Sequence, residues 1–152
     1  MRIAIGSDHA GYQLKELVGQ WLTDLGHEVR DFGTQGSEST DYPRYGRLVA
    51  EAVAEGEAER GVLVCGTGIG MSITANKVPG VRAAVCHDAF TTRLCRAHND
   101  ANVLCLGARV LGEGVVQDLL PLFLDTPFEG GRHTRRLGLI CALEEDAPRR
   151  AG

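Results

Sequence analysis

The chain has 152 residues, of which 43% are hydrophobic and 24% are charged, a balance typical of one globular domain with a substantial core. Its formal net charge of -4 argues against a nucleic-acid or anionic-membrane binder, so clustered arginines are expected to serve a small anionic ligand. No apolar run reaches the roughly 18 residues that span a bilayer, and no signal-peptide core follows Met1, so we expect a cytoplasmic protein without a membrane partner.

Five short β-rich runs alternate with helical patterns, which predicts an α/β fold with a parallel sheet. The predicted strands cover residues 2–5, 28–31, 62–65, 81–86 and 103–106. The predicted helices cover residues 14–25, 43–56, 69–76, 88–97, 113–124 and 132–145. We therefore predict a single domain over residues 1–146, followed by a polar tail at 147–152.

The first helix is the clearest of these predictions. Apolar residues from Leu14 to Leu25 recur at the i, i+3, i+4, i+7 spacing, and Gly26 follows them. Pro43 suits the first turn of the second helix, which Gly56 ends. Pro121 falls inside the fifth helical pattern, so we expect it to kink that helix or to end it early.

Ligands of open α/β sheets bind beyond the carboxyl ends of the strands. The first strand leads to Asp8 and His9, the third ends at Cys65, and Arg109 follows the fifth, which residues 94–102 precede. We expect all of these segments to meet at one rim. Asp8 and His9 are placed there for substrate hydroxyls, although a packing role is equally compatible with their position.

The loop Cys65-Gly-Thr-Gly-Ile-Gly70 carries the most chemical information in the chain. It joins an apolar strand to a helix, so its backbone N–H groups and the positive helix end favour a thiolate on Cys65 and a bound oxyanion. The structural alternative is a tight turn with Cys65 as a small core residue. Three alternating glycines exceed what one turn needs, which favours the ligand-binding interpretation.

Three phosphate-binding signatures fail on this chain. The glycine loop has Met71 where a dinucleotide-binding motif needs its third glycine, and it follows the third strand rather than the first. Residues 6–11 are followed by Tyr12 and Gln13, where a P-loop needs lysine and serine or threonine. A cysteine-phosphatase loop would need arginine at Met71 to hold the phosphoryl group.

Arg132 and Arg136 lie four residues apart after two glycines, so a helix that begins there presents both on one face near its positive end. This arrangement suits a phosphate, with Arg109 as a third charge. A solvated basic face that includes Arg135 is the alternative. His98 is a candidate acid/base, although a lone histidine at a helix end commonly has no catalytic role.

The five cysteines form no C-x-x-C pair and show no zinc-type spacing. We expect Cys65 to be functional and the other four to be buried thiols. His27, His87 and His133 show no spacing to carboxylates or cysteines that would build a metal site. The sequence therefore predicts no metal and no other cofactor.

Six motifs, at residues 6–11, 40–43, 65–70, 75–77, 98–100 and 130–133, together resemble the ribose-5-phosphate isomerase B family over nearly the whole chain. The family also includes allose-6-phosphate and galactose-6-phosphate isomerases. The resemblance implies a Rossmann-like three-layer α/β/α sandwich. It also implies a homodimer or homotetramer with active sites shared between subunits, and no metal or organic cofactor.

The resemblance further implies the roles of individual residues. Cys65 is similar to the base that moves a proton between C1 and C2, His98 to the group that opens the sugar ring, and Thr67 to a proton relay between O1 and O2. Sugar hydroxyls would be held by Asp8, His9 and Asn99, and the phosphate by Arg109, Arg132 and Arg136 with help from His9. The developing oxyanion would be bound by the amides of Gly66, Thr67, Gly68, Ile69 and Gly70.

The implied activity is interconversion of ribose 5-phosphate and ribulose 5-phosphate. One branch of the family uses a glutamate base at the position of Met71, so this chain resembles the cysteine branch. The alternatives are an isomerase of a six-carbon sugar phosphate and a non-catalytic module that binds a phosphorylated ligand.

Overall fold

The computed structural model describes residues 1–146, and the predicted polar tail at 147–152 lies outside these residues. The elements, in chain order, are β1 (Arg2–Ser7), α1 (Tyr12–Asp24), β2 (Glu28–Asp31), α2 (Tyr42–Ala54), β3 (Arg60–Cys65), α3 (Ile69–Ala75), β4 (Ala83–Val85), α4 (Ala89–Ala97), β5 (Val103–Gly107), α5 (Glu113–Asp125) and α6 (Arg132–Asp146). Within these residues no helix is long and apolar enough to cross a membrane.

The five strands form one parallel sheet in the order β2-β1-β3-β5-β4. The central strands β1, β3 and β5 are apolar on both faces because helices cover both sides, as is usual for parallel sheets. This arrangement confirms the predicted α/β fold with a Rossmann-like five-stranded parallel sheet. β4 is shorter than predicted, because Val81 and Cys86 lie outside the strand pairing.

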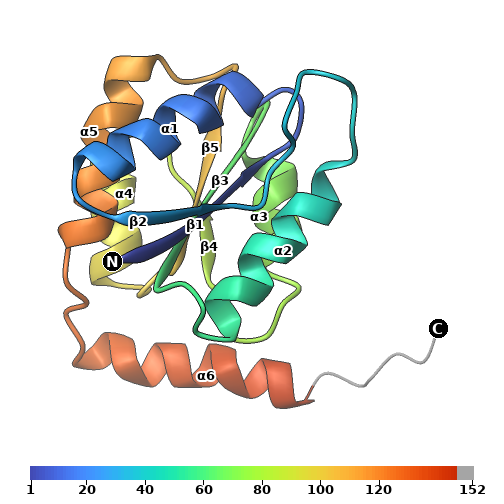
Figure 1. The fold of residues 1–152 in the computed structure, drawn as a ribbon. Coiled ribbons are helices and arrows are strands. Elements are labelled where there is room, and N and C mark those ends of the chain that lie inside the picture. The colour runs from blue at the N-terminus through green and yellow to red at the C-terminus, as the bar shows by residue number, and fades with distance from the viewer. Residues whose placement is uncertain (147–152) are drawn as a thin grey trace.

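Helices cover the two faces of the sheet (Figure 1). One face packs against α1, α4 and α5, with Val18 and Phe123 fully buried at its centre. The other face packs against α2 and α3, with Val49 and Met71 fully buried. Each helix contributes an apolar stripe at helical spacing, so burial of these stripes against the sheet stabilises the three layers.

The fifth helix does not end early at Pro121. α5 continues through Pro121 to Asp125, so of the two predicted alternatives, a kink or an early end, the early end is wrong. Proline costs about 3 kcal/mol inside a helix, but Leu120, Phe123 and Leu124 on both sides of it are buried in the core. Burial of such side chains is worth roughly 2 kcal/mol each, which outweighs the cost of the proline.

α6 lies apart from the other helices, along the edge where the strands begin (Figure 1). Glu144 of this helix accepts hydrogen bonds of 3.0 and 3.1 Å from the backbone N–H of Gly80, which precedes β4. Cys141 on α6 is exposed, whereas Cys86, Cys95 and Cys105 are buried. The prediction that Cys141 is a buried thiol is therefore wrong, because within residues 1–146 α6 contributes no side chain to the hydrophobic core.

Candidate active site

A cavity of about 470 Å³ opens at the carboxyl edge of the sheet, beyond the ends of β1, β3 and β5. Eight of the predicted site residues line it: Asp8, His9, Cys65, Gly66, Thr67, Ile69, Gly70 and Arg109. Ala10, Tyr42 and Ile73 complete the lining, and they were not predicted as site residues. The volume lies in the range of pockets that bind small molecules.

Cys65 ends β3 and is almost fully buried at the base of this cavity, with 5% of its surface exposed. The backbone N–H of Gly68 donates a hydrogen bond of 3.1 Å to its Sγ. This contact holds the sulfur against the glycine loop, at the N-terminus of α3. The loop thus supplies a nucleophilic or basic sulfur together with a polar backbone.

Gly68 is suited to donate this hydrogen bond to Cys65 because of its backbone conformation. Its φ is +80°, and a Cβ there would lie 3.1 Å from the carbonyl carbon of Leu106 and 3.3 Å from the backbone of Cys105. A side chain at Gly68 would therefore be strained twice, by the left-handed φ and by contact with β5. The first N–H groups of α3 have no partners within the helix, and that of Ile69 donates a 3.3 Å hydrogen bond to Thr67 Oγ1. N–H groups at such a position commonly bind anions.

Arg109 brings a positive charge to the same loop. Its backbone N–H donates a 3.0 Å hydrogen bond to the carbonyl of Gly66, and its guanidinium packs against the Cα side of Gly66. A Cβ at Gly107 would lie 2.9 Å from the carbonyl group of Thr67, so glycine there permits the close approach of the two segments. Arg109 is thereby placed beside Cys65, where it would attract an anionic substrate.

Asp8 and His9 are both fixed by backbone groups. Asp8 Oδ1 accepts a 3.1 Å hydrogen bond from the N–H of Gly11, which closes the turn into α1. His9 Nδ1 accepts a 3.2 Å hydrogen bond from the N–H of Thr40. Because Nδ1 is the acceptor, the neutral ring carries its proton on Nε2, so His9 is a hydrogen-bond donor through that atom.

His98 and Asn99 lie at the opposite edge of the sheet. β5 begins at Val103, soon after His98, and ends at Gly107, which pairs with Cys65. A five-residue strand spans roughly 13 Å, so His98 is too far from Cys65 to share a small substrate within one chain. The prediction that residues 94–102 join the same rim is therefore wrong, because they precede the start of the strand.

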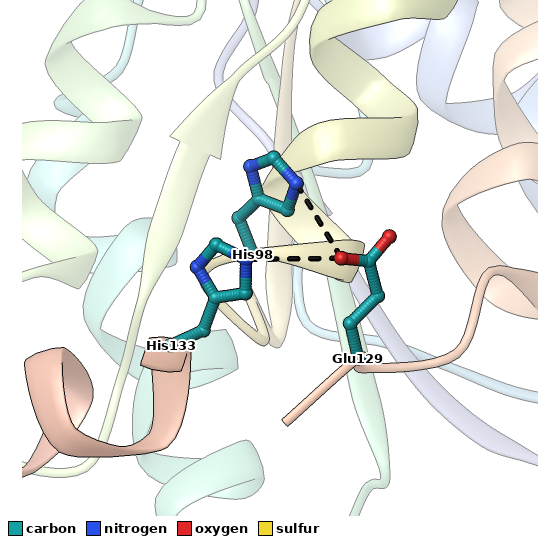
Figure 2. Close-up of side chains that lie close together, drawn as sticks. All are labelled: His98, Glu129 and His133. Carbon is teal, nitrogen blue, oxygen red and sulfur yellow. Dashed lines mark ion pairs between the residues drawn. The ribbon is translucent and has the colours of Figure 1, made fainter. Parts of the chain in front are cut away.

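His98 belongs instead to a cluster with Glu129 and His133, which we call the histidine cluster (Figure 2). The His98 and His133 rings stack with centroids 4.2 Å apart and planes 13° apart. Burial and the nearby charges of His98 and Arg132 lower the pKa of His133. The sequence patterns did not predict this cluster, and the expectation that His133 has no suitably spaced carboxylate is wrong, because Glu129 precedes it by four residues.

Arg132 and Arg136 are exposed at the start of α6, beside the histidine cluster rather than in the Cys65 cavity. Tyr42 is a second missed residue, and its ring lies 2.8 Å from where a Cβ of Gly70 would be. It lies within the motif at residues 40–43, which could have drawn attention to it. The predicted site residues thus form two groups, one at each edge of the sheet.

Residues 3–140 match the family of ribose and galactose isomerases. The chain belongs to the ribose/galactose isomerase family. It is 47% identical over 144 residues to ribose-5-phosphate isomerase B of Escherichia coli, an alignment that covers 95% of this chain and 97% of the relative. The family consists of isomerases, so the protein is an enzyme of that class.

A solved structure of ribose-5-phosphate isomerase B from Clostridium thermocellum superposes with a TM-score of 0.95 at 53% identity, covering 96% of this chain and 99% of that chain. A more distant relative is the galactose-6-phosphate isomerase subunit LacB of Clostridium acetobutylicum, 39% identical over 148 residues, with 96% of this chain and 86% of the relative covered. Family membership alone therefore does not identify which sugar phosphate the enzyme uses.

Proposed function

We propose that the protein interconverts ribose 5-phosphate and ribulose 5-phosphate through an enediolate. The observation that carries this proposal is the hydrogen bond from the Gly68 N–H to Cys65 Sγ, inside a cavity that also holds Arg109. An aldose–ketose isomerase needs a base beside a carbonyl and a group that stabilises the resulting oxyanion. Relatives named as ribose-5-phosphate isomerases support the choice of sugar.

In this mechanism the Cys65 thiolate takes the proton from C2 and returns it to C1. The Thr67 hydroxyl moves a proton from O2 to O1, and the loop amides bind the charge that develops on oxygen. The phosphate, held by arginine, orients the reacting carbons over the sulfur. His98 transfers the proton that opens the sugar ring before isomerisation begins.

The mechanism requires two chains, because His98 and Cys65 lie at opposite edges of one chain's sheet. We place His98, Asn99, Arg132 and Arg136 of one subunit against the Cys65 cavity of its partner in a homodimer or a dimer of dimers. The exposed apolar side chains of α6 support such an interface; they include Leu139, Ile140 and Leu143, of which 60%, 45% and 67% of the surface is exposed.

The test compares turnover of ribose 5-phosphate, allose 6-phosphate and galactose 6-phosphate by the purified protein. We expect ribose 5-phosphate to be the best substrate. We also expect Cys65→Ala to lower kcat by about a thousandfold or more, while it leaves binding of the phosphorylated substrate within about threefold. Unchanged turnover in Cys65→Ala would contradict the role of the sulfur.

A six-carbon sugar phosphate is the second candidate substrate, favoured by the similarity to a galactose-6-phosphate isomerase subunit. A kcat/KM on either six-carbon substrate that is higher than on ribose 5-phosphate would identify that sugar as the preferred substrate. Substrate binding without turnover of any of the three sugars would favour the phospholigand-binding module instead.

A further inference from the structure

The histidine cluster has the composition of a transition-metal site. It brings together two imidazoles and one carboxylate, the ligand set that Zn²⁺ accepts alongside an exchangeable fourth ligand. The three side chains come from separate segments: His98 follows α4, Glu129 lies between α5 and α6, and His133 is in the first turn of α6. The backbone N–H of Glu129 donates a 2.9 Å hydrogen bond to the carbonyl of Ala97, which fixes the two segments together.

The distances in the cluster suit an ion better than they suit direct hydrogen bonds. Nε2 of His98 and Nε2 of His133 each lie 3.7 Å from the same oxygen, Oε2 of Glu129 (Figure 2). An N–H···O hydrogen bond is at most about 3.2 Å long, so neither contact is one. Two ligand atoms at about 2.05 Å from a tetrahedral zinc are about 3.35 Å apart, only a few tenths of an ångström less than observed.

All three ligand atoms lie within 4.8 Å of one another. The rings are nearly parallel, so they must tilt toward each other for both nitrogens to reach one ion. Two of the ligands are free to adjust: 33% of the His98 side chain and 58% of the Glu129 side chain is exposed, whereas His133 is 8% exposed. Arg132 and Arg136 oppose a cation here, so we expect weaker binding than at a closed structural zinc site.

We propose that His98, Glu129 and His133 bind a divalent ion of the zinc class, and that the bound ion inhibits the enzyme. The ion occupies the lone pair on Nε2 of His98, which is then unable to accept or deliver a proton. The inhibitory part rests on the proposed function of His98 in ring opening. The binding part rests only on the geometry of the three side chains.

The experiment titrates metal-free, full-length protein with Zn²⁺ by calorimetry and with Co²⁺ by visible absorption. We expect one ion per chain, cobalt bands of a four-coordinate site, and isomerase inhibition that a chelator reverses. Glu129→Gln keeps the shape of the side chain but removes its charge, so it should weaken zinc binding at least tenfold. Glu113→Gln, an exposed carboxylate at the start of α5, is the matched control and should bind like the wild type.

Equal zinc affinity in Glu129→Gln and wild type would overturn the site. A thiolate-to-cobalt charge-transfer band would overturn it too, since a cysteine would then be a ligand. Zn²⁺ could bind one ion per chain, and more weakly in Glu129→Gln, without inhibiting the isomerase. That result would overturn the proposed inhibition but support the binding site. The protein could bind Zn²⁺ in this way and yet turn over none of the three sugar phosphates. That result would support the metal site and count against the proposed function.

Discussion

Gly68 shapes the immediate environment of the Cys65 sulfur through its backbone. Gly68→Ala would introduce a Cβ at φ +80° and 3.1 Å from the backbone of Leu106, so the loop must shift and the hydrogen bond to Sγ must lengthen. We expect kcat to fall by about a hundredfold, the scale on which loss of one oxyanion-stabilising donor acts in other enzymes. Steady-state kinetics on ribose 5-phosphate measures the effect.

Gly114→Ala is the control for this substitution. Gly114 lies in the first turn of α5 with no atom within 4 Å of its added Cβ, and its φ is not positive. The variant should keep full activity and equal or greater stability. If Gly68→Ala also keeps full activity, the loop backbone has no part in the chemistry.

Arg136 is the residue that best tests the proposed contact between arginine and the substrate phosphate. It is exposed on α6 and does not belong to the packed core on either face of the sheet, so Arg136→Ala should leave the melting temperature nearly unchanged. We expect KM for ribose 5-phosphate to rise at least tenfold, because a charge-assisted bond to phosphate is lost. Arg135→Ala, the neighbouring exposed arginine, provides the comparison; equal KM changes in both would indicate a general charge effect rather than a specific contact.

At the scale of elements, the segment between β2 and α2 is held against the carboxyl end of β1 by a buried lysine. Lys15 of α1 is fully buried, and its Nζ pairs with Asp31 and donates a 3.0 Å hydrogen bond to the carbonyl of Thr34. The N–H of Thr34 in turn donates a 3.1 Å hydrogen bond to the carbonyl of Ser7. The same segment continues to Thr40, whose N–H orients His9. Through these hydrogen bonds α1 is connected to the Cys65 cavity, which His9 lines.

Lys15→Met should lower the free energy of unfolding by about 3 kcal/mol, because it leaves Asp31 without its partner in a partly buried place. Burial lowers the pKa of Lys15, but hydrogen bonds and charge attraction from Asp31 and Glu16 outweigh it, so the pKa is raised above its ordinary value of 10.5. The stabilisation is therefore complete below that pH and is lost as pH rises above it.

Urea unfolding of both proteins at pH 7 and at a series of values above pH 10.5 measures this dependence. The difference in stability between wild type and Lys15→Met should shrink as the pH rises through the upper part of the series. A difference that stays constant would mean that the lysine contributes by packing and not by charge.

At the scale of the whole molecule, the two groups of site residues lie at opposite edges of one chain's sheet, so the proposed mechanism needs two chains. Cys65→Ala and His98→Asn should each be inactive alone. Co-expression with two different tags yields mixed dimers, and each mixed dimer has one intact site. With random pairing, about half of the dimers are mixed, so we expect about a quarter of wild-type activity.

Purification through both tags enriches the mixed dimers, whose activity should approach about half that of the wild type. Activity no higher than that of the single variants would place Cys65 and His98 of the same chain in one site. That result would contradict the shared-site arrangement while leaving the isomerase assignment intact.

The sequence by itself determined the parallel sheet and one half of the site. Apolar periodicity marks the strands and helices locally, and parallel strands end at a common edge, so Asp8, Cys65 and Arg109 had to meet there.

Three-dimensional packing decided the rest. Pro121 stays within α5 because buried neighbours outweigh its cost, which no local pattern expresses. His98 and His133 meet because the chain after α5 returns to the end of α4, a contact between segments more than 30 residues apart along the chain. Local spacing does not encode such contacts, since they depend on how separate elements pack.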